Sequence, residues 1–451
     1  MKKHTQSPYE SSEISYKPSG IKWLGEIPQS WKNVSIRSCF TESNQRCNTD
    51  SYPLLSVTIA NGIIYQDDIE NKKDISNDDK SNYKIVPLNA VAYNKMRMWQ
   101  GAVGVNTLTI GIVSPAYIVA IPNEKILPNF VSYLFKSKIM ISEFDKNSYG
   151  LCLDMNNLRY DDFRNIKIPL PPLQEQKEIA EFLDEKCEKI QNYIDKKQKL
   201  ITLLQEKKQA LINEAVCGRV ACHTERSEVS TTAYKPSGIE YLGLIPHHWE
   251  VKKLKYVGKV VLGKMLCNEH QKGYSHCYYL KSKNLQWLNV EVSQIEKMWF
   301  SEYEKSLYRI KKDDLLVSEG GEVGKTCIWN NELAECYIQN SVHKITLNKF
   351  NNAKFFLYLF FTYGKLGVFD SVVSRVSIAH LVLEKLVNVD MVVPPLQEQK
   401  QIANFLDKKC EKINSAIEKT KRQIKLIKEY KNTLINEAVC GRINLQKKER
   451  I

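Results

Sequence analysis

The sequence predicts a mixed α/β protein in which two related globular domains are joined by two long antiparallel helices packed as a coiled coil. Three observations predict this fold class. An internal repeat spans most of the chain, the two copies diverge in their middles, and each copy ends in a long segment with helical periodicity. With 451 residues, 43% of them hydrophobic and 26% charged, the chain is long enough for two or three domains that each bury a core.

The repeat begins with a segment that contains tryptophan. YKPSGI followed by WLGEIPQSW, from Tyr16 to Trp31, returns as YKPSGI followed by EYLGLIPHHW, from Tyr234 to Trp249. Further along, PPLQEQK at 171–177 and INEAVCGR at 212–219 both return 223 positions later. The middles, 34–167 and 251–390, share little identity. A shared framework that carries two different middles indicates two related domains that bind two different things.

Short matches within the middles predict shared elements. The strand-like run AVAY, starting at Ala90, precedes QGAVG, and the strand-like run LLVS, starting at Leu315, precedes GGEVG. NFVSYLF at Asn129 and KFFLYLFF at Lys354 resemble one helix in two versions. Each domain should therefore contain a glycine turn after a buried strand and a helix further on.

The terminal segments of the two copies predict helices over 172–217 and 395–440. Proline is tolerated in the first helical turn, and glycine is favoured just past the last one, as at Gly218 and Gly441. Glu175 and Glu398 would complement the positive ends of the helix dipoles. Each helix would be about 69 Å long at 1.5 Å per residue, which is longer than a single domain needs.

An apolar stripe with heptad-like spacing follows each of these segments. The predicted seam consists of Ile179, Leu183, Ile190, Ile194, Ile201, Leu204 and Leu211 in the first helix, and Ile402, Leu406, Ile413, Ile417, Ile424, Ile427 and Leu434 in the second. A stripe this narrow predicts that the two helices pack on each other. The alternative is that each helix packs only on its own domain. The segment 173–219 carries no net charge, whereas 396–442 carries +5, so the second helix could approach a nucleic acid backbone.

Composition predicts a cytoplasmic protein with a polyanionic partner. The formal net charge is +14, and clustered Lys and Arg side chains favour phosphates as partners. No apolar run is long enough for a membrane span, so no membrane partner is expected, and the first residues do not resemble a secretory signal. The twelve cysteines include no C-x-x-C pair, which favours reduced thiols over a disulfide framework or a zinc site.

The chain as a whole resembles the specificity subunit of type I restriction-modification systems. The resemblance rests on the two opening segments, the two variable middles and the PPLQEQxxIAxFLD motif, which occurs twice. It implies two target recognition domains that each read one half of a bipartite double-stranded DNA sequence, with the paired helices as a spacer. It also implies two methyltransferase subunits that modify adenine, and restriction subunits, as partners. The cofactors S-adenosylmethionine, ATP and Mg²⁺ would belong to those partners, and none to this chain.

On this interpretation the sequence divides into six parts. They are a first recognition domain at 1–170, a first spacer helix at 171–219, a linker at 220–233, a second recognition domain at 234–393, a second spacer helix at 394–442 and a tail at 443–451.

No catalytic motif is expected in this chain. An N/D-P-P-F/Y tetrapeptide, a glycine-rich cofactor loop and the common hydrolase motifs are all missing. EGGEVGKT at 319–326 comes near a phosphate-binding loop, so a coiled-coil ATPase that uses Gly320–Thr326 is an alternative function. However, Glu319 replaces the first glycine, and no clear helix follows the loop. A structural scaffold without DNA specificity is a third possibility.

Candidate DNA contacts cluster at the glycine turns and before the final strand of each domain. They are Lys95, Arg97, Trp99, Gln100, Ser148 and Tyr149 in the first domain, and Glu319, Glu322, Lys325, Arg375 and Ser377 in the second. Arg can pair with guanine, Gln with adenine and Glu with cytosine, whereas Lys suits a phosphate. His343 and His380 follow apolar residues and are expected to be packed rather than ligands.

Overall fold

The computed structural model describes residues 15–47, 52–69, 80–150, 156–220, 233–239, 242–369 and 380–445. The chain divides into two compact units, one formed by residues 1–198 and 422–451 and the other by residues 199–421. Each unit therefore contains one domain, half of the first long helix and half of the second.

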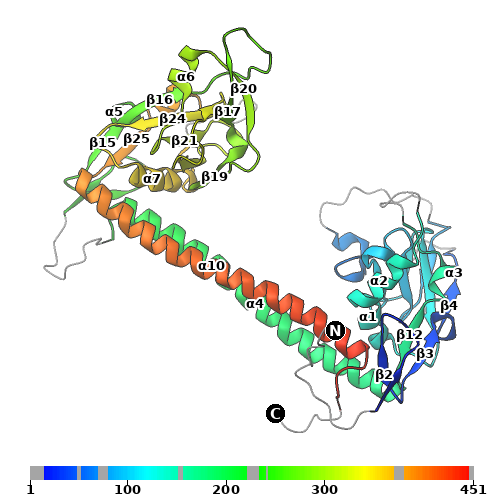
Figure 1. The fold of residues 1–451 in the computed structure, drawn as a ribbon. Helices are drawn as coiled ribbons and strands as arrows, with labels where there is room; N and C mark the ends of the chain where they lie inside the picture. Colours follow the sequence, from blue (N-terminus) through cyan, green and yellow to red (C-terminus); the bar gives the residue numbers. More distant parts are fainter. Residues whose placement is uncertain are drawn as a thin grey trace, which may run out of the picture. The chain divides into compact units, whose positions relative to one another are not determined.

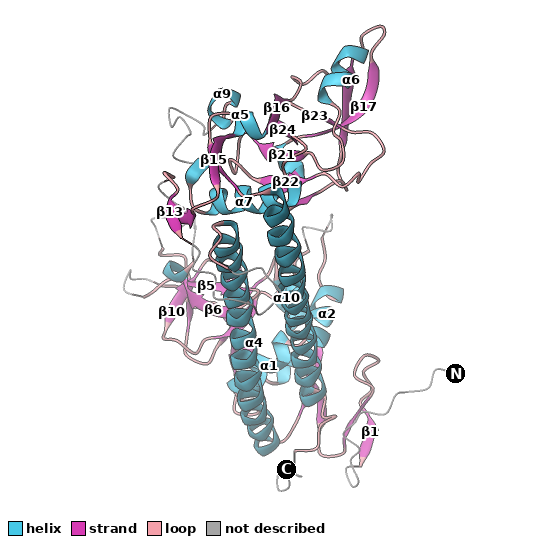
Figure 2. Cartoon of the chain, turned by 90° about the vertical axis from the view of Figure 1, so that its left-hand side faces the viewer, coloured by secondary structure: helices cyan, strands magenta, loops and turns pink. Residues whose placement is uncertain are grey.

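The long helices are α4 (Leu173–Val216) and α10 (Leu396–Val439), each of 44 residues. Within each unit, the halves of α4 and α10 lie side by side (Figures 1 and 2). The N-terminal half of α4 meets the C-terminal half of α10 in the first unit, and the reverse holds in the second, so the helices run antiparallel. Both helices begin and end within one residue of the bounds predicted from Pro and Gly.

The predicted seam is buried along most of its length. Ile179, Leu183, Ile190, Ile194, Ile201, Ile402, Leu406, Ile417, Ile424 and Leu434 are buried, and Leu204, Leu211, Ile413 and Ile427 are half-buried. Cys187, Cys410 and Thr420 fill buried positions between these residues. Helix ends also pack on the domains, because Ile402, Leu406 and Ile212 belong to the core of the second unit. The two packing arrangements that the sequence left open therefore occur together.

In the first domain the strands are β1 (Tyr16–Pro18), β2 (Glu26–Pro28), β3 (Lys32–Ser35), β4 (Phe40–Ser43), β5 (Leu55–Thr58), β6 (Gly62–Tyr65), β7 (Lys84–Val86), β8 (Val91–Asn94), β9 (Val103–Val105), β10 (Gly111–Val113), β11 (Tyr117–Pro122) and β12 (Lys167–Leu170). The helices are α1 (Pro128–Lys136), α2 (Lys138–Lys146) and α3 (Tyr160–Phe163), and a short 3₁₀ helix, η3, spans Met98–Gln100. The central antiparallel sheet has the order β4-β11-β8-β9.

In the second domain the strands are β13 (Tyr234–Pro236), β14 (Leu244–Pro246), β15 (Glu250–Lys253), β16 (Gly258–Leu262), β17 (Ser275–Leu280), β18 (Leu285–Gln286), β19 (Asn289–Val290), β20 (Glu296–Phe300), β21 (Leu315–Ser318), β22 (Thr326–Ile328), β23 (Tyr337–Ile338), β24 (Val342–Leu347) and β25 (Asp390–Val393). The helices are α5 (Leu254–Val257), α6 (Glu302–Tyr308), α7 (Ala353–Lys365) and α9 (Leu383–Leu386).

The two domains share one framework despite their divergent sequences. The central sheet of the second domain has the order β16-β24-β21-β22. This order matches β4-β11-β8-β9 of the first domain strand for strand, and β16 and β4 come first along the chain in their sheets. In each domain the strand before the long helix pairs with an early strand, β12 with β3 and β25 with β15. The predicted common helix is α1 in the first domain and α7 in the second. The domains differ outside this framework, where the first has the hairpin β5-β6 and the second has the sheet β20-β17-β23.

Candidate nucleic-acid interface and its helical support

The PPLQEQ motif joins each domain to its helix. The carboxylate of Glu175 accepts hydrogen bonds from Trp31 Nε1 at 2.7 Å and Ser30 Oγ at 3.0 Å. In the second unit, Glu398 accepts from Trp249 Nε1 at 2.9 Å and contacts His248 Nε2 at 2.7 Å. Both indoles are buried, so each carboxylate satisfies an N–H group that would otherwise be left unpaired. The predicted favourable placement near the helix dipole is thus combined with a specific bond.

The last glutamine of the motif is fully buried in both units. Gln176 Nε2 donates to Pro171 O at 2.8 Å and Lys125 O at 3.0 Å, while its Oε1 accepts from Leu127 N at 2.8 Å. Gln399 Nε2 donates to Pro394 O at 2.8 Å, and its Oε1 accepts from Asn352 N at 2.7 Å. The glutamine therefore ties the helix start to the loop that follows the strand β11 or β24.

The INEAVCGR motif closes each unit at the same end as the PPLQEQ motif, but from the other long helix. Gly441 has φ +73° and lies against Pro28 and Trp31, and Tyr16 Oη donates to Gly441 O at 3.1 Å. In the second unit Gly218, with φ +70°, lies against Pro246 and Trp249, and Tyr234 Oη donates to Gly218 O at 3.0 Å. The end of α10 thus packs on the opening segment of the first domain, and the end of α4 packs on that of the second.

A tyrosine from each domain bonds to its spacer helix about two turns beyond the buried glutamine. Tyr133 Oη donates to Asp184 Oδ1 at 2.5 Å, and Tyr358 Oη donates to Asp407 Oδ1 at 2.8 Å. Burial and the neighbouring carboxylate raise the pKa of both phenols, which stay protonated as donors. Together with the glutamine, this bond fixes the orientation of α1 or α7 on the helix.

The structure places four of the six predicted contact residues of the first domain in one turn and the other two on a segment after α2. Lys95, Arg97, Trp99 and Gln100 lie in the turn between β8 and β9, and Gly101 there has φ +91°. Arg97 and Gln100 are exposed, and Trp99 is half-buried with its Nε1 donating to Met96 O at 3.0 Å. Lys95 O accepts from Leu158 N at 2.8 Å, and Tyr149 pairs with Asn157, so Tyr149 lies on a neighbouring segment and is 66% exposed. Ser148 Oγ instead bonds back to Phe144 O at the end of α2.

The side chain of Lys136 supports this turn. Its Nζ donates to Thr58 O, Ile59 O and Gly101 O at 2.8–3.1 Å. Burial lowers the pKa of Lys136 to about 8. The apolar pattern of the helix gave no signal for this role.

The turn of the second domain has the same location but different chemistry. Leu381 N donates to Glu319 O at 2.8 Å, which matches the bond between Leu158 and Lys95. Lys325 Nζ lies 3.1 Å from Glu322 Oε2, and Glu322 also accepts from Trp287 Nε1 and lies 3.7 Å from Lys365 Nζ. Burial raises the pKa of Glu319. Glu322 and Lys325 thus neutralise each other here, while Arg375 and Ser377 lie outside the described residues.

One expectation from the sequence is corrected, and one alternative function gains no support. His343 is fully buried as expected, with its Nε2 2.6 Å from Leu381 O, but His380 is exposed. The loop Gly320–Thr326 joins the antiparallel strands β21 and β22, and Thr326 opens a strand rather than a helix. A phosphate-binding loop needs a following helix N-terminus, so the geometry gives no support to the ATPase alternative.

No group of three or more His, Cys, Asp or Glu side chains that could hold a metal ion occurs within the described parts of the chain. No helix in those same parts is long and apolar enough to cross a membrane.

Comparison with known proteins agrees with the framework described above. The family model of the type I restriction modification DNA specificity domain matches twice, at residues 28–204 and 246–426. The chain therefore belongs to this family.

Several proteins that resemble the chain are specificity subunits of type I restriction enzymes or come from studies of type I restriction-modification systems. The chain is 24% identical over 452 residues to the provisionally named MjaX type I restriction enzyme specificity subunit of Methanocaldococcus jannaschii, covering 94% of this chain and 96% of that protein. It is 25% identical over 349 residues to the MjaVIII specificity subunit of the same organism, covering 74% and 75%. The HsdS subunit of Thermoanaerobacter tengcongensis has a similar fold, with a TM-score of 0.53, 16% identity and coverage of 92% and 98%. A chain from a structural study of type I R-M complex assembly matches with a TM-score of 0.67, 15% identity and the same coverage.

Proposed function

We propose that this chain is the subunit of a type I restriction-modification complex that reads a bipartite DNA sequence, one half with each domain. The observation that carries the proposal is that the two domains share one framework but differ in the turns at the end of the central sheet. Both domains hold the same four-stranded sheet on the same helical motifs, yet the turns at its end carry Arg97 and Gln100 in one domain and Glu319 and Lys325 in the other. Groups that differ on a constant support suit the recognition of two unlike half-sites.

The paired helices would set the gap between the half-sites. In proteins that bind two half-sites, the spacing follows from the geometry of the protein that joins the reading elements. Because the seam is buried and both helix ends are bonded to the domains, each domain would be held firmly on its part of the spacer. The net charge of +14 would supply affinity for phosphates.

Chemistry on the DNA would belong to partner subunits. Two methyltransferase subunits would modify adenine in the target with S-adenosylmethionine, and restriction subunits would cleave DNA with ATP and Mg²⁺. We place the complex in the cytoplasm, where its DNA substrate would be met. This chain would contribute recognition and assembly but no catalytic group.

Reconstitution tests this function. The purified chain is expected to show no methyl transfer alone, and to direct adenine methylation at one bipartite sequence when its methyltransferase partner is added. Sequencing of methylated adenines in random DNA measures both outcomes. Methyl transfer by the isolated chain would contradict the division of labour, and methylation without any preferred sequence would favour a scaffold instead.

A further inference from the structure

The corner that leads into the longest strand of the central sheet occupies the same place in both domains. In the first domain, β10 is followed by Ser114–Pro115–Ala116 and then by β11; in the second, β23 is followed by Gln339–Asn340–Ser341 and then by β24. The strands β11 and β24 are matched by their positions in the two sheets. The two corners are thus equivalent in the framework but carry different side chains.

Each corner lies at the end of its strand that is remote from the spacer helix. The other end of β24 leads to Asn352, whose backbone N–H donates to Gln399 at the start of α10. The other end of β11 leads to Leu127, whose N–H donates to Gln176 at the start of α4. Six residues of extended strand, about 20 Å long, separate each corner from the loop that carries this attachment. In the second domain the corner also adjoins the glycine turn, because Glu319 N donates to Ser341 O at 2.9 Å.

The backbone of the second corner is held on several sides. Gln339 N donates to Leu280 O at 3.0 Å and Asn340 N to Lys264 O at 2.8 Å, while Gly263 lies directly against the Gln339 backbone. Ser282 Oγ donates to Ser341 O at 2.7 Å, and Ser341 Oγ accepts from Ser282 N at 3.0 Å. A side chain displayed from such a corner loses little freedom when it binds.

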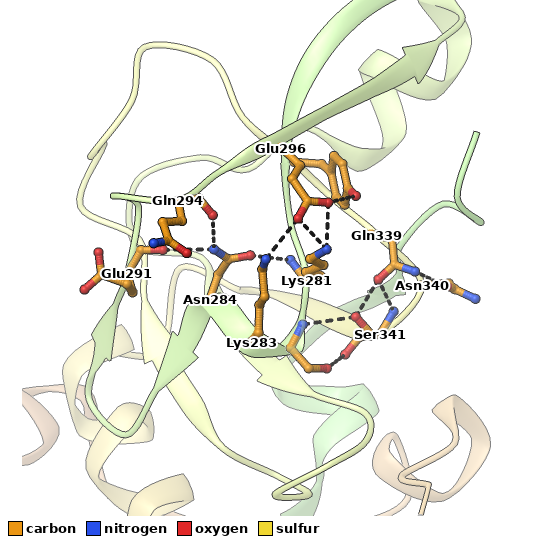
Figure 3. A network of polar contacts seen from close by, with 11 residues as sticks. Lys281, Lys283, Asn284, Glu291, Gln294, Glu296, Gln339, Asn340 and Ser341 are labelled. Carbon is orange, nitrogen blue, oxygen red and sulfur yellow. Dashed lines mark hydrogen bonds and ion pairs between the residues drawn. The ribbon is translucent and has the colours of Figure 1, made fainter. Parts of the chain in front are cut away.

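The polar side chains at this corner are oriented by one another (Figure 3). Gln339 Oε1 accepts from Ser341 N at 3.2 Å and from Ser341 Oγ, and Gln339 Nε2 donates to Asn340 Oδ1. In the described part of the chain, Asn340 Nδ2 has no hydrogen-bond partner. Asn340 is half-buried, and it lies at the edge of the network in Figure 3. It thus retains two donor protons and the second lone pair of Oδ1.

The two nearby lysines are bonded to a shared carboxylate and not to this amide. Lys281 Nζ and Lys283 Nζ lie 2.6 Å and 2.9 Å from the carboxylate of Glu296, and Tyr279 Oη donates to it at 2.9 Å. These bonds, led by that of Lys281, lower the pKa of Glu296 to about 2. These contacts hold Tyr279, Lys281 and Lys283 on Glu296 beside the corner.

We propose that Asn340 reads an adenine in the second half-site, with Gln339 as a positioning residue that orients its amide. This inference rests on the proposed function of the chain. An asparagine amide presents one donor and one acceptor, which match N7 and N6 of adenine in the major groove. The matched corner of the first domain, Ser114–Pro115–Ala116, has no side-chain amide, so the first domain cannot make this contact there.

The test uses the reconstituted complex with its methyltransferase subunits. The methylated bipartite sequence is first mapped for the wild-type chain, and rates are then measured on duplexes with single base changes. Asn340→Ala is expected to lose discrimination at one A·T pair of the second half-site by about 5- to 150-fold, the range of one bidentate contact. Asn340→Asp, which keeps the shape but loses the donor, should lose adenine preference at the same pair. Gln339→Ala should weaken that preference without shifting its position.

Matched controls separate the possible failures. Lys349→Ala alters an exposed side chain beyond the opposite end of β24 and should leave both half-sites unchanged. The first half-site serves as an internal control for folding and assembly in every variant. If Asn340→Ala and Asn340→Asp keep the wild-type preference at every position of the second half-site, the assignment of Asn340 is wrong while the proposed function stands. If the wild-type complex prefers no sequence, the proposed function itself fails.

Discussion

Replacing Gly441 with alanine should weaken the first unit by more than backbone strain alone. A Cβ atom at this position would lie 2.6 Å from Pro28 Cδ and 3.1 Å from Trp31 Cη2. Gly441 also has φ +73°, a conformation that costs an L-residue about 1–2 kcal/mol. Displacing a packed proline and a buried tryptophan adds about 1–3 kcal/mol, as for other overpacked sites. The expected loss is therefore about 2–5 kcal/mol in the free energy of unfolding.

Gly25→Ala measures the backbone contribution alone, so the difference between Gly441→Ala and Gly25→Ala isolates the steric contribution. Gly25 has φ +72°, but no atom lies within 4 Å of a Cβ built there. Gly25→Ala should lose only the free energy that the backbone conformation costs. The free energies of unfolding of the two variants, measured by urea denaturation, should therefore differ by about 1–3 kcal/mol. Gly218→Ala and Gly238→Ala form the corresponding pair in the second unit, with and without a close contact, and they identify which unfolding transition belongs to which unit. Equal losses for Gly441→Ala and Gly25→Ala would refute the proposed closure of the first unit by the end of α10.

Three further predictions concern the spacer and the second core. Ile190→Asp should cost several kcal/mol because it buries an unpaired charge in the seam, whereas Asn192→Asp at an exposed position should be nearly neutral in denaturation experiments. Matched insertions of two helical turns in α4 and α10 should change the gap between the half-sites and leave each half-site unchanged, as measured by methylation mapping. Altered half-sites would contradict the proposal that the helices set the gap and the domains read the half-sites. Burial lowers the pKa of His343 below 6.5, so the second unit should have its full stability above pH 6.5 and lose stability as the pH falls below that value. In thermal denaturation, His343→Gln should flatten the dependence of stability on pH, whereas His247→Gln at an exposed position should not.

The sequence predicted the long helices well because their signals are local. Proline at one end, glycine at the other and a 3.5-residue apolar period each depend on residues within a few turns, and the bounds came out within one residue. The buried positions between the predicted seam residues were missed because they are occupied by Cys187, Cys410 and Thr420, which an apolar pattern does not include.

Roles that depend on distant partners could not be predicted. Glu175 was expected to complement the helix dipole, but nothing in its neighbourhood along the chain indicates that Trp31, 144 positions away, donates to it. Tyr16 and Gly441 are 425 positions apart, so the closure of the first unit follows only from the antiparallel packing of the helices. Gln339 and Asn340 were likewise missed, because their display depends on the pairing of β23 with β17 and of β24 with β21.

The duplication itself separates framework residues from recognition residues. A residue that holds the framework should have a counterpart with the same contact in the other copy, as Glu175, Gln176, Tyr133 and Gly441 do. Lys136 fails this criterion, because its matched position holds Phe361, and the second turn is instead contacted by Phe369, whose ring lies against Gly324. The two turns are thus supported by unrelated side chains. Each can change without disturbing the other, which is what independent evolution of two half-site specificities requires.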